Sequence, residues 1–166
     1  MKAFIDLMLK PFILAFLLLS FSLFAHDFNA GQIEVNHPWA RPTAPVVKTG
    51  AVYLVINNPT HQAELLLSVE VPSTIAELAQ IHQTEYSQNM AKMREAHSGL
   101  LIPAENSLEL IPGGSHIMLV GLKTPLVEGE KFPMELRFEH SGEITVEVWV
   151  EERLTPNAAT SNHSHH

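Results

Sequence analysis

The residues best suited to chemistry lie in a short stretch, residues 115–119, that carries one histidine and one methionine among apolar neighbours. Successive side chains of a β-strand point to opposite faces. A strand here therefore places His116 and Met118 on one face and turns Ile117 and Leu119 toward a core. An imidazole and a thioether then project side by side, which is half of a metal site.

A second segment supplies the same two types of donor. It begins with His82 and ends with Met90 and Met93, three residues apart. If residues 86–89 form the loop of a hairpin, His82 and Met93 lie across from each other. Two imidazoles and two thioethers form a soft, neutral ligand set that suits Cu(I), whereas magnesium and calcium prefer oxygen ligands. Both imidazoles must be unprotonated, so we expect binding to weaken below about pH 6.

These residues also have purely structural interpretations. Methionines commonly fill gaps in a core, and Met134 is assigned there because it alternates with Phe132, Leu136 and Phe138. Met90 is either a loop residue or an additional metal ligand. Any half-exposed strand could carry the pair of residues 116 and 118, so that pair alone does not establish a metal site.

The composition excludes several other kinds of site. The 166 residues include ten histidines and six methionines but no cysteine, which rules out disulfides, cysteine-held zinc, iron–sulfur clusters and a His₂Cys blue-copper centre. The net charge of −8 argues against nucleic acid as a partner. We find no nucleophile–base motif and no paired-carboxylate signature, so we expect no enzyme.

Residues 1–25 have the layout of a signal peptide. A cationic start with Lys2 and Lys10 precedes the apolar run of residues 11–25, which is shorter than the roughly 20 residues of a membrane span. We expect cleavage after Ala25, which leaves an exported domain without a membrane span. Leu23 is large for its position before that bond, so an uncleaved N-terminal anchor is the alternative.

The rest of the chain has the pattern of an all-β domain. Apolar and polar residues alternate over residues 132–138 and 144–150, and a turn at residues 140–142 separates them. Turn-forming residues separate further expected strands, at residues 32–35, 50–57, 63–71, 75–84, 108–110 and 116–120. Residues 74–79 could instead form a helical turn. The pattern predicts a single Greek-key sandwich or barrel over residues 26–152.

The chain resembles the periplasmic copper chaperones of the PCuAC family. Their signature is a histidine, ten residues, a methionine, about twenty-one residues and His-X-Met. Here His82 is followed by ten residues and Met93, and then by twenty-two residues and the triplet at residues 116–118. The resemblance extends over residues 38–41, 48–53, 111–119, 121–123 and 142–148. One departure is Gln83 and Thr84, where the family often has a methionine.

The resemblance implies a cupredoxin-like Greek-key β-sandwich with one exposed Cu(I) site on His82, Met93, His116 and Met118. It implies a periplasmic carrier that delivers copper to the cytochrome c oxidase subunit carrying the CuA site, together with Sco-type thiol proteins. A periplasmic copper buffer or scavenger is the alternative. A further alternative is an electron carrier or an enzyme built on a β-sandwich.

Residues 153–166 form an expected flexible tail that contains His163, His165 and His166. Clustered histidines are typical of metal-binding tracts, and these three are candidates for Cu(II). The alternative is a purification tag or an incidental tail.

Overall fold

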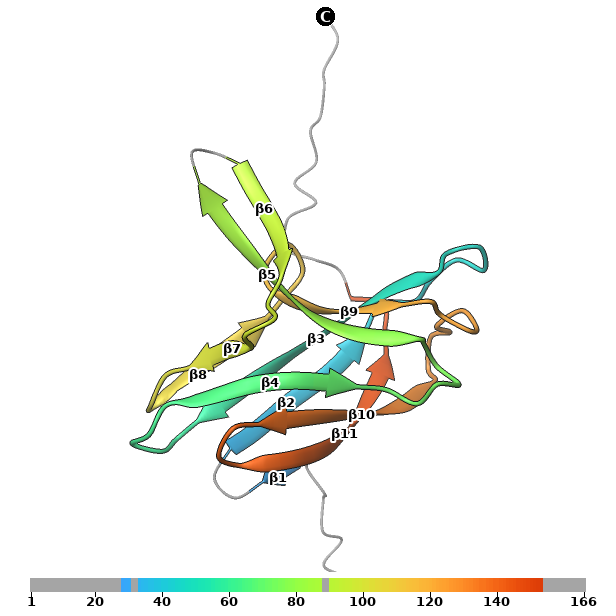
Figure 1. Ribbon diagram of the computed structural model, residues 1–166. Helices are drawn as coiled ribbons and strands as arrows, with labels where there is room; N and C mark the ends of the chain where they lie inside the picture. Colours follow the sequence, from blue (N-terminus) through green and yellow to red (C-terminus); the bar gives the residue numbers. More distant parts are fainter. Residues whose placement is uncertain (1–27, 31–32, 88–89, 154–166) are drawn as a thin grey trace, which may run out of the picture.

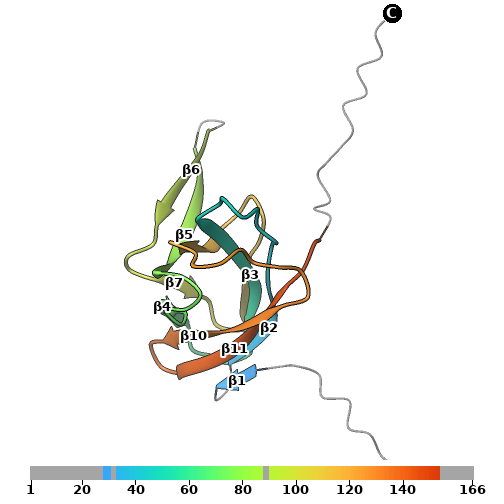
Figure 2. The ribbon, with the colours of Figure 1, turned by 90° about the vertical axis from the view of Figure 1, so that its right-hand side faces the viewer.

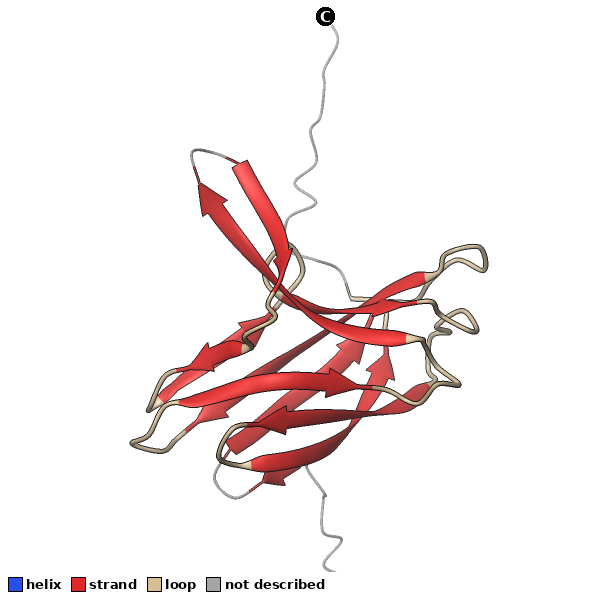
Figure 3. Ribbon diagram, viewed as in Figure 1, coloured by secondary structure: helices blue, strands red, loops and turns tan. Residues whose placement is uncertain are grey.

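The computed structural model describes residues 28–30, 33–87 and 90–153 (Figure 1). Every regular element in these ranges is a strand (Figure 3). The described residues contain no helix that could cross a membrane. The strands are β1 (Phe28–Ala30), β2 (Ile33–Ala40), β3 (Thr49–Asn58), β4 (Glu64–Glu70), β5 (Leu78–Ser87), β6 (Met90–Glu95), β7 (Leu100–Ile102), β8 (Asn106–Leu110), β9 (His116–Val120), β10 (Lys131–Phe138) and β11 (Gly142–Val150). The predicted signal peptide and the tail histidines lie outside the described residues.

The strands form one continuous sheet in the order β6-β5-β9-β3-β2-β11-β10-β4-β7, with β1 added to β2 and β8 added to β3. All neighbours are antiparallel except β11 and β2, which are parallel. The sheet curls so that its two halves face each other across the core (Figures 1 and 2). The all-β sandwich expected from the sequence is confirmed.

The core is built from strand faces that alternate with solvent-facing ones. On β10, the four side chains predicted to share a buried face do so, and Met134 is fully buried among them. Three of these residues have buried partners on β11, at Ile144, Val146 and Val148. Each large apolar side chain buried in this way stabilises the fold by about 1.5–3 kcal/mol relative to leaving it exposed.

Two boundaries near the middle of the chain differ from the prediction. The strand expected from residue 75 begins only at Leu78, because Pro72 starts a turn in which the N–H of Ile75 donates to its carbonyl, with N and O 2.8 Å apart. The same strand then continues through Tyr86 to Ser87, so the loop expected over residues 86–89 is wrong in its first half. The hairpin of β5 and β6 is therefore longer than expected, and its far end stands away from the rest of the sheet (Figure 1).

A bulge in β2 shifts the register of the strand just before a buried tryptophan. The pairing of β2 with β3 shifts between Asn36 and Trp39, and His37 has a positive φ of 48°. Pro38 has no N–H to donate, so a bulge is a position where a strand can accept it. Beyond the bulge, Trp39 pairs with Tyr53 on β3, and both side chains are buried.

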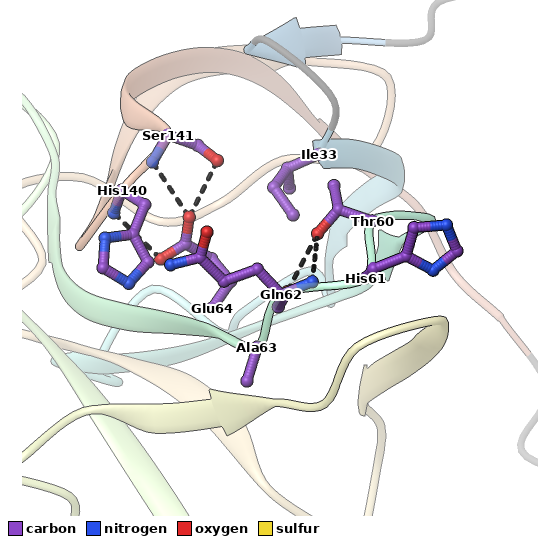
Figure 4. Close-up of a pocket in the computed structure, with 8 residues that line it drawn as sticks. All are labelled: Ile33, Thr60, His61, Gln62, Ala63, Glu64, His140 and Ser141. Carbon is purple, nitrogen blue, oxygen red and sulfur yellow. Dashed lines mark hydrogen bonds between the residues drawn. The ribbon is translucent and has the colours of Figure 1, made fainter.

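A buried carboxylate ties β4 to the turn between β10 and β11. Glu64 is 4% exposed and accepts hydrogen bonds from the N–H groups of Leu65, His140 and Ser141 and from the hydroxyl of Ser141, at 2.8–3.0 Å. Figure 4 shows the carboxylate below the donors of His140 and Ser141. Burial acts to raise the pKa of Glu64, but the four hydrogen bonds outweigh it, so that the pKa lies below its ordinary value.

This geometry predicts the effect of replacing Glu64 with glutamine. A carboxyl whose pKa is lowered by folding stabilises the protein fully above its unfolded pKa of about 4.3, and that contribution is lost as the pH falls through the lower folded pKa. We expect Glu64→Gln to reduce the free energy of unfolding at pH 7 by about 1–3 kcal/mol. Between about pH 5 and pH 3, the variant should lose less stability than the wild type.

Urea unfolding at several pH values measures both effects. The matched control is Glu143→Gln, which removes an exposed carboxylate that pairs with Arg137 on the neighbouring strand. An exposed ion pair contributes about 0–1 kcal/mol, so this control should stay close to the wild type. Equal losses in the two variants would contradict the role given to Glu64.

Candidate metal centre

The two predicted histidine ligands lie directly opposite each other on neighbouring strands. His82 of β5 pairs with His116 of β9, next to the pair formed by Ile81 and Ile117. The two isoleucines are buried in the core. Because side chains alternate along a strand, the two histidines project from the other face of the sheet.

The two imidazole rings are close enough to share a metal ion. Their centroids are 5.6 Å apart, and their planes are inclined by 46°. Imidazole nitrogens bind metal ions at about 2.0 Å, so one ion fits between two rings at this separation. His116 is 9% exposed and His82 is half-buried, which gives the pair one covered side and one side open to solvent.

Both predicted methionine ligands lie on the same face as the histidines. Met118 is two residues along β9 from His116, and it pairs with Gln80 of β5 and Ala51 of β3. Met93 of β6 is 53% exposed. The four side chains thus occupy one face of three adjacent strands.

The position of Met93 across the hairpin differs from the prediction. Met93 pairs with Thr84, and the residue opposite His82 is Glu95. The longer β5 causes this shift of two residues, which keeps Met93 on the predicted face but places it diagonally to His82. Diagonal neighbours of this kind remain within reach of long side chains. Met90 pairs with Ser87 at the start of β6, and its side chain is outside the described part of the structure.

A glycine carbonyl orients His116. The Nδ1 atom of His116 lies 3.0 Å from the carbonyl oxygen of Gly114, which also accepts a hydrogen bond of 2.9 Å from the Thr84 hydroxyl. A carbonyl only accepts, so Nδ1 carries the proton and the lone pair of His116 is on Nε2. The turn that presents this carbonyl has a positive φ of 80° at Gly113, a conformation that glycine adopts readily.

The electrostatic surroundings favour a neutral His82. Burial of its ring lowers the pKa of His82, the neighbouring His116 lowers it further, and the carboxylate of Glu95 opposes both effects. The Nδ1 atom of His82 is buried without a hydrogen-bond partner. Its Nε2 atom lies 3.4 Å from the amide oxygen of Gln80. A neutral imidazole is the form that binds metals.

Two buried aromatic residues extend from His116 into the protein, and neither was among the predicted site residues. The ring of Tyr53 is centred 6.3 Å from that of His116 and 4.7 Å from that of Trp39. Burial raises the pKa of Tyr53, and the positive charge of Arg41 partly offsets this, so the phenol is neutral at pH 7. Both residues lie in stretches that the family resemblance covers, 38–41 and 48–53, but no spacing in the sequence indicates that they meet beside the histidines.

The described residues contain one other cluster of potential metal ligands. Glu64, Glu139 and His140 bring ligand atoms within 4.8 Å of one another. Both oxygens of Glu64 already accept hydrogen bonds from the protein, as described above. This cluster is accounted for by the cap that Glu64 places on the turn between β10 and β11.

Solved PCuAC domains share this fold. The apo PCuAC domain from PmoF1 is 26% identical, with a TM-score of 0.65, and the match covers 77% of this chain and 100% of that one. The copper-bound PCuAC domain from PmoF2 has a TM-score of 0.64 at 24% identity, with coverage of 77% and 99%. The solution structure of the Cu(I) form of DR1885 from Deinococcus radiodurans is 29% identical, with a TM-score of 0.57 and coverage of 72% and 80%. The fold is thus that of a PCuAC domain, the cupredoxin-like β-sandwich predicted from the sequence.

Sequence comparison identifies the family. A family model described as "Putative lipoprotein LpqE-like" matches residues 33–150. A protein of Leifsonia xyli subsp. xyli (strain CTCB07), described as "Putative lipoprotein Lxx21020", is 44% identical over 124 residues, which cover 75% of this chain and 72% of that protein. Protein RP573 of Rickettsia prowazekii (strain Madrid E), described as uncharacterized, is 32% identical over 121 residues, with coverage of 71% and 66%. The chain belongs to the LpqE-like family of PCuAC-type proteins.

The surroundings of His82 predict how it titrates. We expect NMR titration of the metal-free protein to give His82 a pKa below the ordinary value of about 6.5, because burial and His116 both disfavour its charged form. His116→Asn should raise this pKa, since it removes a neighbouring positive charge. Glu95→Gln should lower it further, since it removes a negative one. A wild-type pKa at or above 6.5 would contradict this description.

Proposed function

We propose that this protein is a copper chaperone that carries Cu(I) on His82, Met93, His116 and Met118. The observation that carries the proposal is the gathering of two imidazoles and two thioethers on one face of β6, β5 and β9. Solved relatives with the same fold are described as copper-bound or Cu(I) forms.

The chemistry of the four donors supports Cu(I) as the cargo. Thioethers are soft ligands, and neutral donors match a soft monovalent ion. A thiolate is softer and charged, so a cysteine-bearing acceptor can remove the ion from a thioether site. The chain itself has no cysteine that would compete with the acceptor. These properties suit a carrier better than a catalyst or an electron-transfer site.

The proposed setting is the periplasm, with residues 1–25 as the export signal and residues 26–152 as the copper-binding domain. Lipoproteins are exported proteins, and the names of the family model and of the Leifsonia relative fit such a location. We propose that copper passes to the CuA-bearing subunit of cytochrome c oxidase, with Sco-type thiol proteins. A periplasmic buffer without a dedicated acceptor is the second candidate.

A competition titration with a chromophoric Cu(I) chelator tests the site. We expect one tight Cu(I) site in the exported protein, and an affinity loss on the order of 100-fold in the Met93→Ala/Met118→Ala double variant, or about 1.4 kcal/mol for each thioether removed. The control is Leu101→Ala on β7, a similarly exposed apolar side chain at 59%. Met90→Ala decides whether Met90 is an additional ligand. Unchanged affinity in the double variant would refute the site.

A shortened protein that ends before Asn162 separates the tail from the domain. We expect it to keep the Cu(I) site and to lose Cu(II) binding at His163, His165 and His166. Loss of the Cu(I) site on shortening would place copper on the tail and contradict the proposal.

Copper transfer distinguishes a carrier from a buffer. The loaded protein is mixed with an isolated CuA-bearing domain, with and without a Sco-type protein, and the rise of the CuA absorption is followed in a stopped-flow instrument. A carrier should transfer copper faster than a chelator removes it by spontaneous dissociation, with a rate that increases with acceptor concentration. A rate equal to the dissociation rate at every acceptor concentration would favour the buffer.

A further inference from the structure

A chain of polar contacts links His82 on β5 to Glu95 and His97. The Nε2 atom of His82 is 3.4 Å from the amide oxygen of Gln80, and the amide nitrogen of Gln80 donates to a carboxylate oxygen of Glu95 at 3.0 Å. The other oxygen of Glu95 is 3.4 Å from Nδ1 of His97. Gln80 and His82 project from the same face of β5, and Glu95 is the partner of His82 on β6.

The direction of each hydrogen bond in this chain follows from Glu95. An ionised carboxylate only accepts, so the amide of Gln80 must turn its NH₂ group toward Glu95. Its oxygen is then directed at His82. Because an amide oxygen also only accepts, the proton of a neutral His82 is on Nε2, and its lone pair is on Nδ1.

The lone pair of His82 is therefore on the nitrogen that has no protein partner. Nδ1 of His82 is buried and makes no hydrogen bond, which is costly for a polar atom. His116 shows the opposite arrangement, since its Nδ1 is held by the carbonyl of Gly114. The two facing rings thus offer one lone pair each, from different ring positions.

We propose that Glu95, acting through Gln80, is a positioning residue that fixes the tautomer of His82 and makes its Nδ1 the atom that binds Cu(I). The proposal rests on the proposed function, because it concerns the same site. Metal-binding histidines almost always donate their second N–H to an oxygen acceptor, and the Gln80 amide supplies that acceptor here. The negative charge of Glu95 also favours a cation between the two rings, where all four ligands are neutral.

The metal-free protein tests the tautomer without copper. In two-dimensional ¹H–¹⁵N NMR spectra of ¹⁵N-histidine-labelled protein, at a pH where His82 is neutral, we expect Nε2 to be protonated and Nδ1 to be bare. Glu95→Gln should give a mixture of both tautomers, because a glutamine at this position can either donate or accept. Glu95→Asp keeps an acceptor-only group and should preserve the wild-type tautomer. A proton on Nδ1 of His82 in the wild type would overturn the proposal.

Cu(I) affinity supplies the second readout. We expect Glu95→Gln to weaken binding about tenfold, the lower end of the range for groups that orient a metal ligand. The matched control is Glu85→Gln, the same charge change on the same hairpin, at an exposed position that faces away from His82. Gln80→Ala combined with Glu95→Gln should weaken binding no more than the stronger single change, since the two residues act in series. Equal effects of Glu95→Gln and Glu85→Gln would overturn the proposal.

The two readouts separate this inference from the proposed function. If the wild type bound no Cu(I), the proposed function would fail together with the assignment of Nδ1 as a ligand, whereas the spectra would still decide what Glu95 does to His82. If Cu(I) bound and the change in ¹⁵N chemical shift caused by binding appeared on Nε2 of His82, the proposed function would stand. This inference would then be wrong.

Discussion

The burial of Ile81 and Ile117 in neighbouring strands fixes the rest of the centre. These two side chains belong to the apolar core, and their pairing sets the register of β5 against β9. A slip of one residue in that register would expose an isoleucine and turn a histidine into the core, so the register is strongly specified. His82 and His116 are therefore held face to face by the packing of their neighbours, with no ion needed to assemble them.

A hydrogen bond to the backbone then sets the rotation of the His116 ring, which the core leaves free. The carbonyl of Gly114 accepts hydrogen bonds from Nδ1 of His116 and from the hydroxyl of Thr84. The second of these joins the β8–β9 turn to β5. Thr84 is one of two residues at which this chain departs from the family it resembles, which often has a methionine there. In this chain its hydroxyl supports the turn that orients a histidine, so the position makes a structural contact.

Several features could be predicted from the sequence because they depend on short-range periodicity. The alternation over residues 115–119 correctly separated His116 and Met118 from the core, and the same reasoning placed Met134 inside it. The partner of Met93 could not be derived, because the register of a hairpin depends on where its turn lies, and β5 continues beyond the expected loop. The contacts of Glu64 with Ser141 and of Trp39 with Tyr53 join positions far apart in the sequence, and no local pattern indicates them.

In the proposed site, the hairpin of β5 and β6 lets different parts of the protein set the rate of ligand exchange and the thermal stability. In the described part of the chain, β6 is bonded to β5 alone, and it carries Met93 at the edge of the sheet. Local opening of an edge strand costs less free energy than global unfolding. In the proposed site, Met93 can therefore leave and rejoin the ion by fraying of this edge, while His116 and Met118 stay on a strand with two neighbours. The rate of ligand exchange in the proposed site would be set by a few hydrogen bonds at the periphery and the thermal stability by the core, so that each could change in evolution without the other.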